Sequence, residues 1–330
     1  MLDHFCKGRK WFLAIVAGAL GTLTAAQAGY AQGTWTALTP VSPSPMEGMT
    51  VGGVGQIIVA AYGFSPVPGN TNQTLLYNIN TDSWSTGAPA PLPARAEAAY
   101  GETTHGGFLY VIGGGNSGVA LSDLQRYDPV LNAWTTLAPM PTARAGAAAA
   151  VIDDGIFVIG GRQSTSGPCS GGPYLQTVEK YDIDTDTWSA VAPLLTPRSD
   201  LAAVAHGGKI FVFGGCTGTA SAPSVTGEVD MYDPQTNTWT TLPSMTTARA
   251  SLVAGHSGDK VCAIGGTNGI SALSVNEVYD ILSNTWSTNT PMTTARQEAG
   301  VNSHGGRIYV VGGSTASFGA STTANEAFKP

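Results

Sequence analysis

The sequence predicts an all-β protein built from six similar units of four strands each. Three observations lead to this prediction. Gly and Pro are frequent, with 43 and 20 of 330 residues, only 11% of the residues are charged, and six tryptophans recur at similar spacing. Long amphipathic helices need more Glu, Lys and Arg, whereas many short strands joined by Gly- and Pro-rich turns agree with this composition. The formal charge of −7 provides no basic surface for nucleic acid.

The repeated unit is recognised from four features. Its Trp recurs every 47 to 54 residues, a Tyr precedes Trp by seven residues in five units, an Arg follows Trp by ten or eleven residues, and Gly-Gly follows that Arg by 16 or 18 residues. The tryptophans are Trp35, Trp84, Trp134, Trp188, Trp239 and Trp286. The arginines are Arg95, Arg144, Arg198, Arg249 and Arg296. The glycine pairs are Gly113-Gly114, Gly160-Gly161, Gly214-Gly215, Gly265-Gly266 and Gly312-Gly313.

Each unit predicts four strands, which we call a to d in chain order. Short β-branched and aromatic runs such as FLYVIGG and KIFVFGG lead into the glycine pair and indicate a buried strand b. Strand a follows the Arg, strand c carries the Tyr and strand d carries the Trp. The short polar a–b turns (HGG) and the c–d turns (DPVLN) are typical of tight hairpins.

An apolar run ending in Gly-Gly, followed by spaced Tyr and Trp, resembles the Kelch repeat from about Gly33 to Pro330. The resemblance implies a six-bladed β-propeller, in which each repeat is a four-stranded blade around a central channel. The Trp, Tyr, Arg and glycine pairs are then expected to be structural. The first unit is degenerate, because Pro45 takes the Arg position and Ala61-Tyr62 the Gly-Gly position.

The two ends of the repeat region predict how the ring closes. Trp35 has no Tyr seven residues before it, and Phe328 aligns with the repeat Tyr although no Trp follows it. We therefore expect the N-terminal strand d around Trp35 to pair with the C-terminal blade, which removes an exposed sheet edge.

The first 28 residues predict a signal peptide. Three basic residues among the first ten precede the apolar run from Trp11 to Leu23, and Ala26-Gln27-Ala28 offers a small-x-small cleavage pattern. Cleavage is expected after residue 28, or as late as 31, which leaves a propeller domain over 29–330. The apolar run is short for a membrane span, so an uncleaved anchor is the less favoured alternative. The protein is expected to be exported to the periplasm or secreted, as a monomer not inserted in the membrane.

Three cysteines lie beyond this segment. In an oxidising compartment, three thiols suggest one disulfide and one buried free cysteine. Cys169 lies in the longest b–c loop, that of the third blade, and Cys216 begins the next b–c loop. Because loops of neighbouring blades lie side by side, we predict a Cys169–Cys216 disulfide and assign Cys262 to the core.

Repeated acidic residues predict ion pairs with the repeated arginines. An acid stands two residues before the strand-c aromatic in four blades, as Glu179, Asp230, Glu277 and Glu326. The blade that lacks the Arg has Leu75 there instead. We predict buried Arg–carboxylate pairs, with Arg95 and Gln125 forming a hydrogen-bonded variant in the second blade.

The start of strand a provides the candidate ligand site. Two residues after the Arg position stand Glu47, Glu97, Gly146, Asp200, Ser251 and Glu298. Four acids of six predict either a solvated rim or an acidic funnel at the channel mouth, suited to a cation, an amine, a metal or a sugar. The candidate ligand-binding residues are Glu47, Glu97, Asp200 and Glu298, with Arg162 and Gln163 from the longest loop.

Two functions follow as hypotheses. The first is an exported binding module that recognises a glycan, peptide or partner protein on the b–c loop face. The alternative is a carbohydrate-active enzyme, since some similar propellers are sialic-acid mutarotases. Glu97, Asp200 or Glu298 would then act as acid–base groups, and Arg162 would hold the sugar carboxylate.

No metal or other cofactor is expected. The His residues that could complete a Ser–His–acid triad or bind copper lie in a–b turns, away from the b–c loops, as His105, His206 and His304. The segment from Asp182 to Asp186 resembles the start of a calcium loop, but it lacks the Gly at position six and the Glu at position twelve.

Overall fold

The structure is a computed structural model that describes residues 32–330 except 68, 165–168, 170–171, 220 and 317–319. Gln32–Pro330 forms one compact unit. The predicted signal peptide, 1–28, and the later cleavage position at 31 lie outside the described residues. Among the residues that are described, none belongs to a helix with the length and apolar character needed to cross a bilayer.

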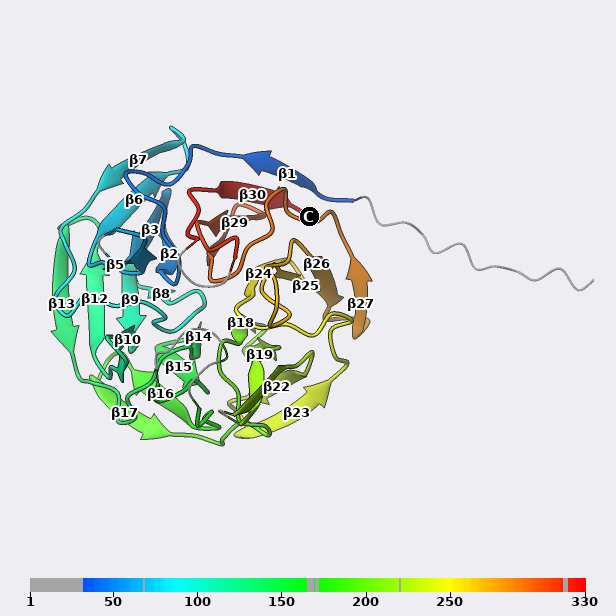
Figure 1. The fold of residues 1–330 in the computed structure, drawn as a ribbon. Coiled ribbons are helices and arrows are strands. Elements are labelled where there is room, and N and C mark those ends of the chain that lie inside the picture. The colour runs from blue at the N-terminus through cyan, green and yellow to red at the C-terminus, as the bar shows by residue number, and fades with distance from the viewer. Residues whose placement is uncertain (1–31, 68, 165–168, 170–171, 220, 317–319) are drawn as a thin grey trace, which may run out of the picture. The chain divides into compact units, whose positions relative to one another are not determined.

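Six antiparallel four-stranded sheets are arranged as the blades of a propeller in this unit (Figure 1), which confirms the predicted fold. Blade 1 contains β2 (Thr50–Val54), β3 (Ile57–Ala61), β6 (Thr74–Asn78) and β7 (Ser83–Thr86). Blade 2 contains β8 (Thr104–His105), β9 (Phe108–Ile112), β12 (Leu124–Asp128) and β13 (Ala133–Leu137). Blade 3 contains β14 (Ala148–Ile152), β15 (Gly155–Ile159), β16 (Val178–Asp182) and β17 (Thr187–Ala190).

Blade 4 contains β18 (Ala202–His206), β19 (Lys209–Phe213), β22 (Val229–Asp233) and β23 (Thr238–Leu242). Blade 5 contains β24 (Val253–Ser257), β25 (Lys260–Ile264), β26 (Asn276–Asp280) and β27 (Thr285–Thr288). Blade 6 contains β28 (Gly300–His304), β29 (Arg307–Val311), β30 (Asn325–Lys329) and β1 (Thr34–Ala37). Strand a is innermost and strand d outermost (Figure 1).

The ring closes through β1, which pairs with β30 so that Trp35 lies opposite Phe328. Their ring centroids are 4.9 Å apart. The Trp35 indole N–H donates to the carbonyl of Thr290 at 2.9 Å, which connects blade 6 to the linker that follows β27 of blade 5. The predicted pairing of the two chain ends in one sheet is therefore confirmed.

The repeated Tyr and Trp join neighbouring blades. In the first five blades the strand-c Tyr stands opposite the strand-d Trp, for example Tyr77 opposite Trp84 and Tyr181 opposite Trp188. The Trp188 indole N–H donates to the carbonyl of Ala138 in the linker from the previous blade. The Tyr181 hydroxyl donates to Asp186, and the same carboxylate oxygen accepts the Ala138 backbone N–H. These residues are structural, as expected.

Four of the repeated arginines form buried ion pairs within their blades, at the predicted partners. Arg144 contacts Glu179 at 2.7 Å and Arg296 contacts Glu326 at 2.8 Å. The other two pairs join Arg198 to Asp230 and Arg249 to Glu277. Each pair connects the start of strand a to strand c, so it fixes the blade beside the channel.

Blade 2 differs from the prediction. Arg95 does not bond to Gln125; it lies 3.5 Å from Asp123 and 4.8 Å from the centre of the Tyr62 ring. Gln125 Oε1 instead accepts the Thr136 hydroxyl at 2.9 Å. Asp123, at the end of the b–c loop, pairs with the Arg95 guanidinium, and Thr136 of the neighbouring strand β13 donates to the Gln125 side chain.

Candidate functional site

A closed ring of six backbone hydrogen bonds surrounds the propeller axis at the start of the strands a. Each member donates its N–H to the carbonyl of the previous member, at 2.6–3.0 Å, and all six have φ of 50–61°. Such positive φ values are favourable for Gly and costly for other residues. The ring consists of Gly48, Glu97, Gly146, Asp200, Ser251 and Glu298.

In blade 1 this ring corrects the predicted alignment by one residue. Gly48, and not Glu47, makes the ring hydrogen bonds, while Glu47 pairs with Phe64 in a β-bridge. The carbonyl of Met46 accepts the N–H of Gly313, as the repeat arginines do elsewhere, so Met46 and not Pro45 holds the Arg position. Likewise Tyr62-Gly63, and not Ala61-Tyr62, takes the glycine-pair position, because Tyr62 has φ of 60°. Because blade 1 lacks both the repeat Arg and the Gly-Gly pair, its sequence contains no residue that fixes its alignment with the other blades.

The four candidate carboxylates lie together but are buried. Glu47, Glu97, Asp200 and Glu298 are only 0–4% exposed. Arg162, also fully buried, reaches Glu97 Oε2 at 2.8 Å and Asp200 Oδ2 at 2.5 Å. The expected solvent-facing acidic funnel is therefore wrong. The acids lie beneath the surface, and Arg162 from the b–c loop of blade 3 is inserted among them.

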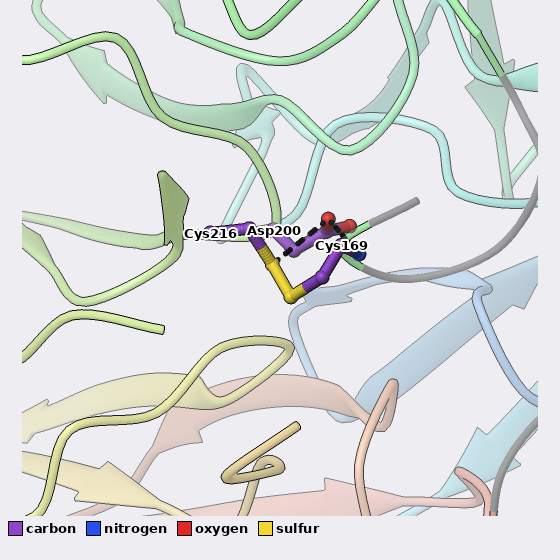
Figure 2. A group of neighbouring side chains, drawn as sticks. All are labelled: Cys169, Asp200 and Cys216. Carbon is purple, nitrogen blue, oxygen red and sulfur yellow. Dashed lines mark hydrogen bonds between the residues drawn. A yellow bond between two sulfur atoms is a disulfide. The ribbon is translucent and has the colours of Figure 1, made fainter. Parts of the chain in front are cut away.

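A disulfide lies beside the ring. Cys169 and Cys216 are linked, with Cα atoms 5.2 Å apart. The Cys169 N–H donates to Asp200 Oδ2 at 3.1 Å, and Figure 2 shows this carboxylate beside the disulfide. The Tyr174 hydroxyl donates to the Cys169 carbonyl at 2.8 Å. The disulfide thus connects blades 3 and 4 beside Asp200 of the ring, and Cys262, the remaining cysteine of the described residues, is buried.

Burial dominates the electrostatics of the ring. It raises the pKa of Glu97, against the opposing effect of Arg162, and it raises the pKa of Glu298 well above the usual value, assisted by the neighbouring carboxylates. Burial and the neighbouring carboxylates therefore favour the neutral form of Glu298. Tyr100, which sequence reasoning missed, lies near these acids, and its hydroxyl has no hydrogen-bond partner among the described residues. The sequence signal that could have identified Tyr100 is its large side chain among the small residues Ala98, Ala99 and Gly101.

The possible metal ligands are otherwise engaged. Among the described residues, the one His/Cys/Asp/Glu cluster compact enough for an ion is Cys169, Asp200 and Cys216, whose sulfurs form the disulfide. The three predicted His residues each contact the next a–b turn instead. His105 reaches Asp154 at 3.0 Å, His206 reaches Asp259 at 2.9 Å, and His304 reaches Gln56 at 3.2 Å. They connect neighbouring blades and do not converge on one ion.

The c–d turn of blade 3 likewise uses its carboxylates locally. Asp182 accepts the Thr185 N–H at 3.0 Å, and Asp186 accepts the Tyr181 hydroxyl at 2.7 Å. These are the hydrogen bonds of a tight turn, so the resemblance to a calcium loop has a structural explanation.

The b–c face carries exposed apolar side chains on projecting loops. Small hairpins are formed by β4 (Phe64–Ser65) with β5 (Gly69–Asn70), β10 (Gly115–Asn116) with β11 (Val119–Ala120), and β20 (Cys216–Thr219) with β21 (Ala222–Val225). Val67 and Val119 in the first two hairpins are 82% and 62% exposed, and Ile270 in the b–c loop of blade 5 is 88% exposed. The six loops contain only three charged residues, Asp123, Arg162 and Glu228. Gln163, a predicted ligand residue, is exposed there.

The fold and its repeated contacts define a Kelch propeller, and the chain belongs to the Kelch-repeat family. Residues 138–313 match the KLHDC2/KLHL20/DRC7 Kelch-repeats domain, and residues 103–141 match the Kelch motif. Kelch propellers are typically protein-interaction modules.

Several known proteins are similar to this chain. Kelch-like protein 25 of Xenopus tropicalis is 29% identical over 68% of this chain and 37% of its own length. Beta-scruin of Limulus polyphemus is 31% identical over 64% of this chain and 24% of its own. The chain thus spans only about a quarter to a third of these relatives. The solved "Structure of YjhT" is 19% identical with a TM-score of 0.74, over 88% of this chain and 96% of that one. This likeness shows the fold alone.

Proposed function

We propose that this propeller is an exported interaction module that binds a partner protein or peptide through its b–c loop face. The observation that carries the proposal is the near absence of charge in the six b–c loops, which also carry the exposed apolar side chains Val67, Val119 and Ile270. Apolar groups on a protruding uncharged surface gain free energy when a partner covers them. An acidic peptide is disfavoured, because Arg162, the one cation of these loops, is buried between two carboxylates.

Export is supported by the cysteine chemistry. A disulfide between b–c loops is favoured in an oxidising compartment and rare in the cytosol. Mass spectrometry of the secreted or periplasmic protein should find a mature N-terminus at Gly29, or at Gln32 with the later cleavage. An intact N-terminus on a cytosolic protein would contradict this.

The mutarotase alternative has less support. Its anchor for a sugar carboxylate, Arg162, is fully buried and already pairs with Glu97 and Asp200. A glycan ligand would instead use the neutral polar rim, where Gln163 is exposed.

The binding face is tested by a matched pair of triple variants. Val67→Ser, Val119→Ser and Ile270→Ser together should abolish crosslinking to a partner protein in periplasmic or culture extract, with an unchanged melting temperature. The control removes three equally exposed side chains at c–d turns on the opposite face, Val130→Ser, Leu131→Ser and Leu282→Ser. Loss of crosslinking in the control, or retention in the first variant, would refute the assignment.

A further inference from the structure

The channel is wide at the end formed by the a–b turns, opposite the b–c loops. A cavity of about 440 Å³ opens there between the inner strands of blades 2 to 5. We call this cavity the vestibule. Further inside, the channel narrows to a space of about 10 Å³ beside Tyr100, Ala203 and Val253. That is close to the minimum for one water. The vestibule itself has the size usual for small-molecule sites, roughly 300–1,000 Å³.

One carboxylate is fixed inside the vestibule. Glu102 Oε1 accepts the backbone N–H of Ser303 from blade 6 at 2.7 Å. This contact passes over blade 1, whose β2 contains Gly52 and Gly53. A Cβ on Gly52 would lie 2.5 Å from Thr104, and one on Gly53 would lie 2.5 Å from Asn302. Because blade 1 has no side chains there, blades 2 and 6 approach each other and hold Glu102 toward the axis.

The charges that line the vestibule are negative. Glu102 and Asp153 are carboxylates, and none of the described lining residues is Lys or Arg. His105 is paired with Asp154. Burial, with a smaller effect of His206, lowers the pKa of His256, so this imidazole is neutral at pH 7. An anionic ligand would find no cation here, whereas a cationic one would meet Asp153 and Glu102. Burial raises the pKa of Glu102 to about 7, and a bound cation would favour its ionised form.

Apart from Thr104 of β8, the remaining wall is aliphatic. It consists of Ala150 and Val151 from β14 and Ala203, Val204 and Ala205 from β18. Such a wall suits the carbon chain of a ligand, while the carboxylate fixes its charged end. A metal ion fits less well, because the vestibule contains no compact group of three ligating atoms among the described residues.

We propose that the vestibule binds a small primary amine, with the ammonium group against Glu102 and the carbon chain along β14 and β18. An ammonium group donates up to three hydrogen bonds and forms charge-assisted bonds to a carboxylate. This site lies at the opposite end of the channel from the face proposed to bind a partner protein, and it does not depend on that proposal.

The test uses three six-carbon probes that differ only in their end groups: 1,6-diaminohexane, 1,6-hexanediol and adipate. Isothermal titration calorimetry should show binding of the diamine, at least about tenfold weaker binding of the diol and none of adipate. The diamine should also raise the melting temperature. Absence of both signals at millimolar diamine, or equal binding of adipate, would overturn the proposal.

Two variants and one control locate the site. Glu102→Gln keeps the oxygen that accepts from Ser303 but removes the charge, and it should weaken diamine binding at least about tenfold. Ala205→Phe fills the vestibule without changing its charge and should abolish binding. Asp123→Asn removes a carboxylate at the opposite end of the channel and should bind like the parent. Unchanged binding by Glu102→Gln, or loss in Asp123→Asn, would refute the location.

Discussion

Replacing Glu277 by Gln tests whether the repeated Arg–carboxylate pairs hold the blades together. Glu277 is 1% exposed and both of its oxygens face donors. Oε2 pairs with Arg249, and Oε1 accepts the backbone N–H groups of Thr246 at 3.1 Å and Thr247 at 3.2 Å. Gln has the same shape, but its amide nitrogen must point at one of these donors. The variant therefore loses the charge and also places two donors against each other.

The expected magnitude follows from burial. Removing one partner of a buried ion pair costs about 3–5 kcal/mol, because the remaining charge is left uncompensated. At roughly 2 °C per kcal/mol for a domain of this size, the melting temperature should fall by about 6–10 °C. The matched control is Asp233→Asn, whose carboxylate pairs with Lys209; both side chains of this pair are partly exposed, at 22% and 37%. Exposed pairs contribute only about 0.2–1 kcal/mol, so this variant should lose about 2 °C or less.

The assay is differential scanning calorimetry of parent and variants at pH 7, with near-ultraviolet circular dichroism to show that each remains folded. Equal shifts for Glu277→Gln and Asp233→Asn would refute the reasoning, because burial would then not determine the cost. A shift below about 1 °C for Glu277→Gln would mean that Arg249 finds another partner at little cost.

Three further predictions concern the vestibule, the disulfide and the closure. Burial raises the pKa of Glu102 to about 7, so ionising it costs more in the folded protein than in the unfolded chain. The stability of the parent protein should therefore fall as pH rises from about 4.5 to 7. The Glu102→Gln variant should be more stable than the parent by about 1–3 kcal/mol at pH 8 and equally stable at pH 4. Chemical denaturation at both pH values measures this difference, and an equal gain at pH 4 would contradict the prediction. Cys169 and Cys216 are 47 residues apart in the sequence, and reduction of their disulfide should lower the free energy of unfolding by about 2–4 kcal/mol. Thermal unfolding in the presence and in the absence of reductant measures this difference. An unchanged transition in a Cys216→Ser variant would contradict the prediction. Trp35→Ala should lower the free energy of unfolding by about 3 kcal/mol and make β1 susceptible to limited proteolysis. A protease-resistant β1 would show that its backbone hydrogen bonds to β30 are enough to keep it in place.

The periodic features of the fold were predictable because each depends on fixed spacing along the chain. The Tyr–Trp pairs across strands c and d, and four Arg–acid pairs, join residues whose separation repeats from blade to blade. The closure was predictable for the same reason, since Trp35 and Phe328 are the two halves of one interrupted repeat.

Deviations from the pattern were harder to predict. In blade 1, neither Arg nor Gly-Gly marks the alignment, and the one-residue shift to Gly48 appears only in the ring of hydrogen bonds. In blade 2, Arg95 takes Asp123 because a loop residue competes with the aligned Gln125. The repeat pattern predicts the usual partner of the repeat Arg, but it does not predict which of two nearby side chains lies closer to that Arg in the folded blade.

The sequence by itself determined the blades, their number and, in five of the six blades, the residue at the start of strand a. Only the tertiary structure decided that Glu97, Asp200 and Glu298 are buried around Arg162, and that Glu102 lies in a pocket at the other end. The physical reason is that the axis is formed by one short segment from each blade and covered by one loop. Burial and charge there depend on the convergence of six distant segments, which no spacing within a single repeat encodes.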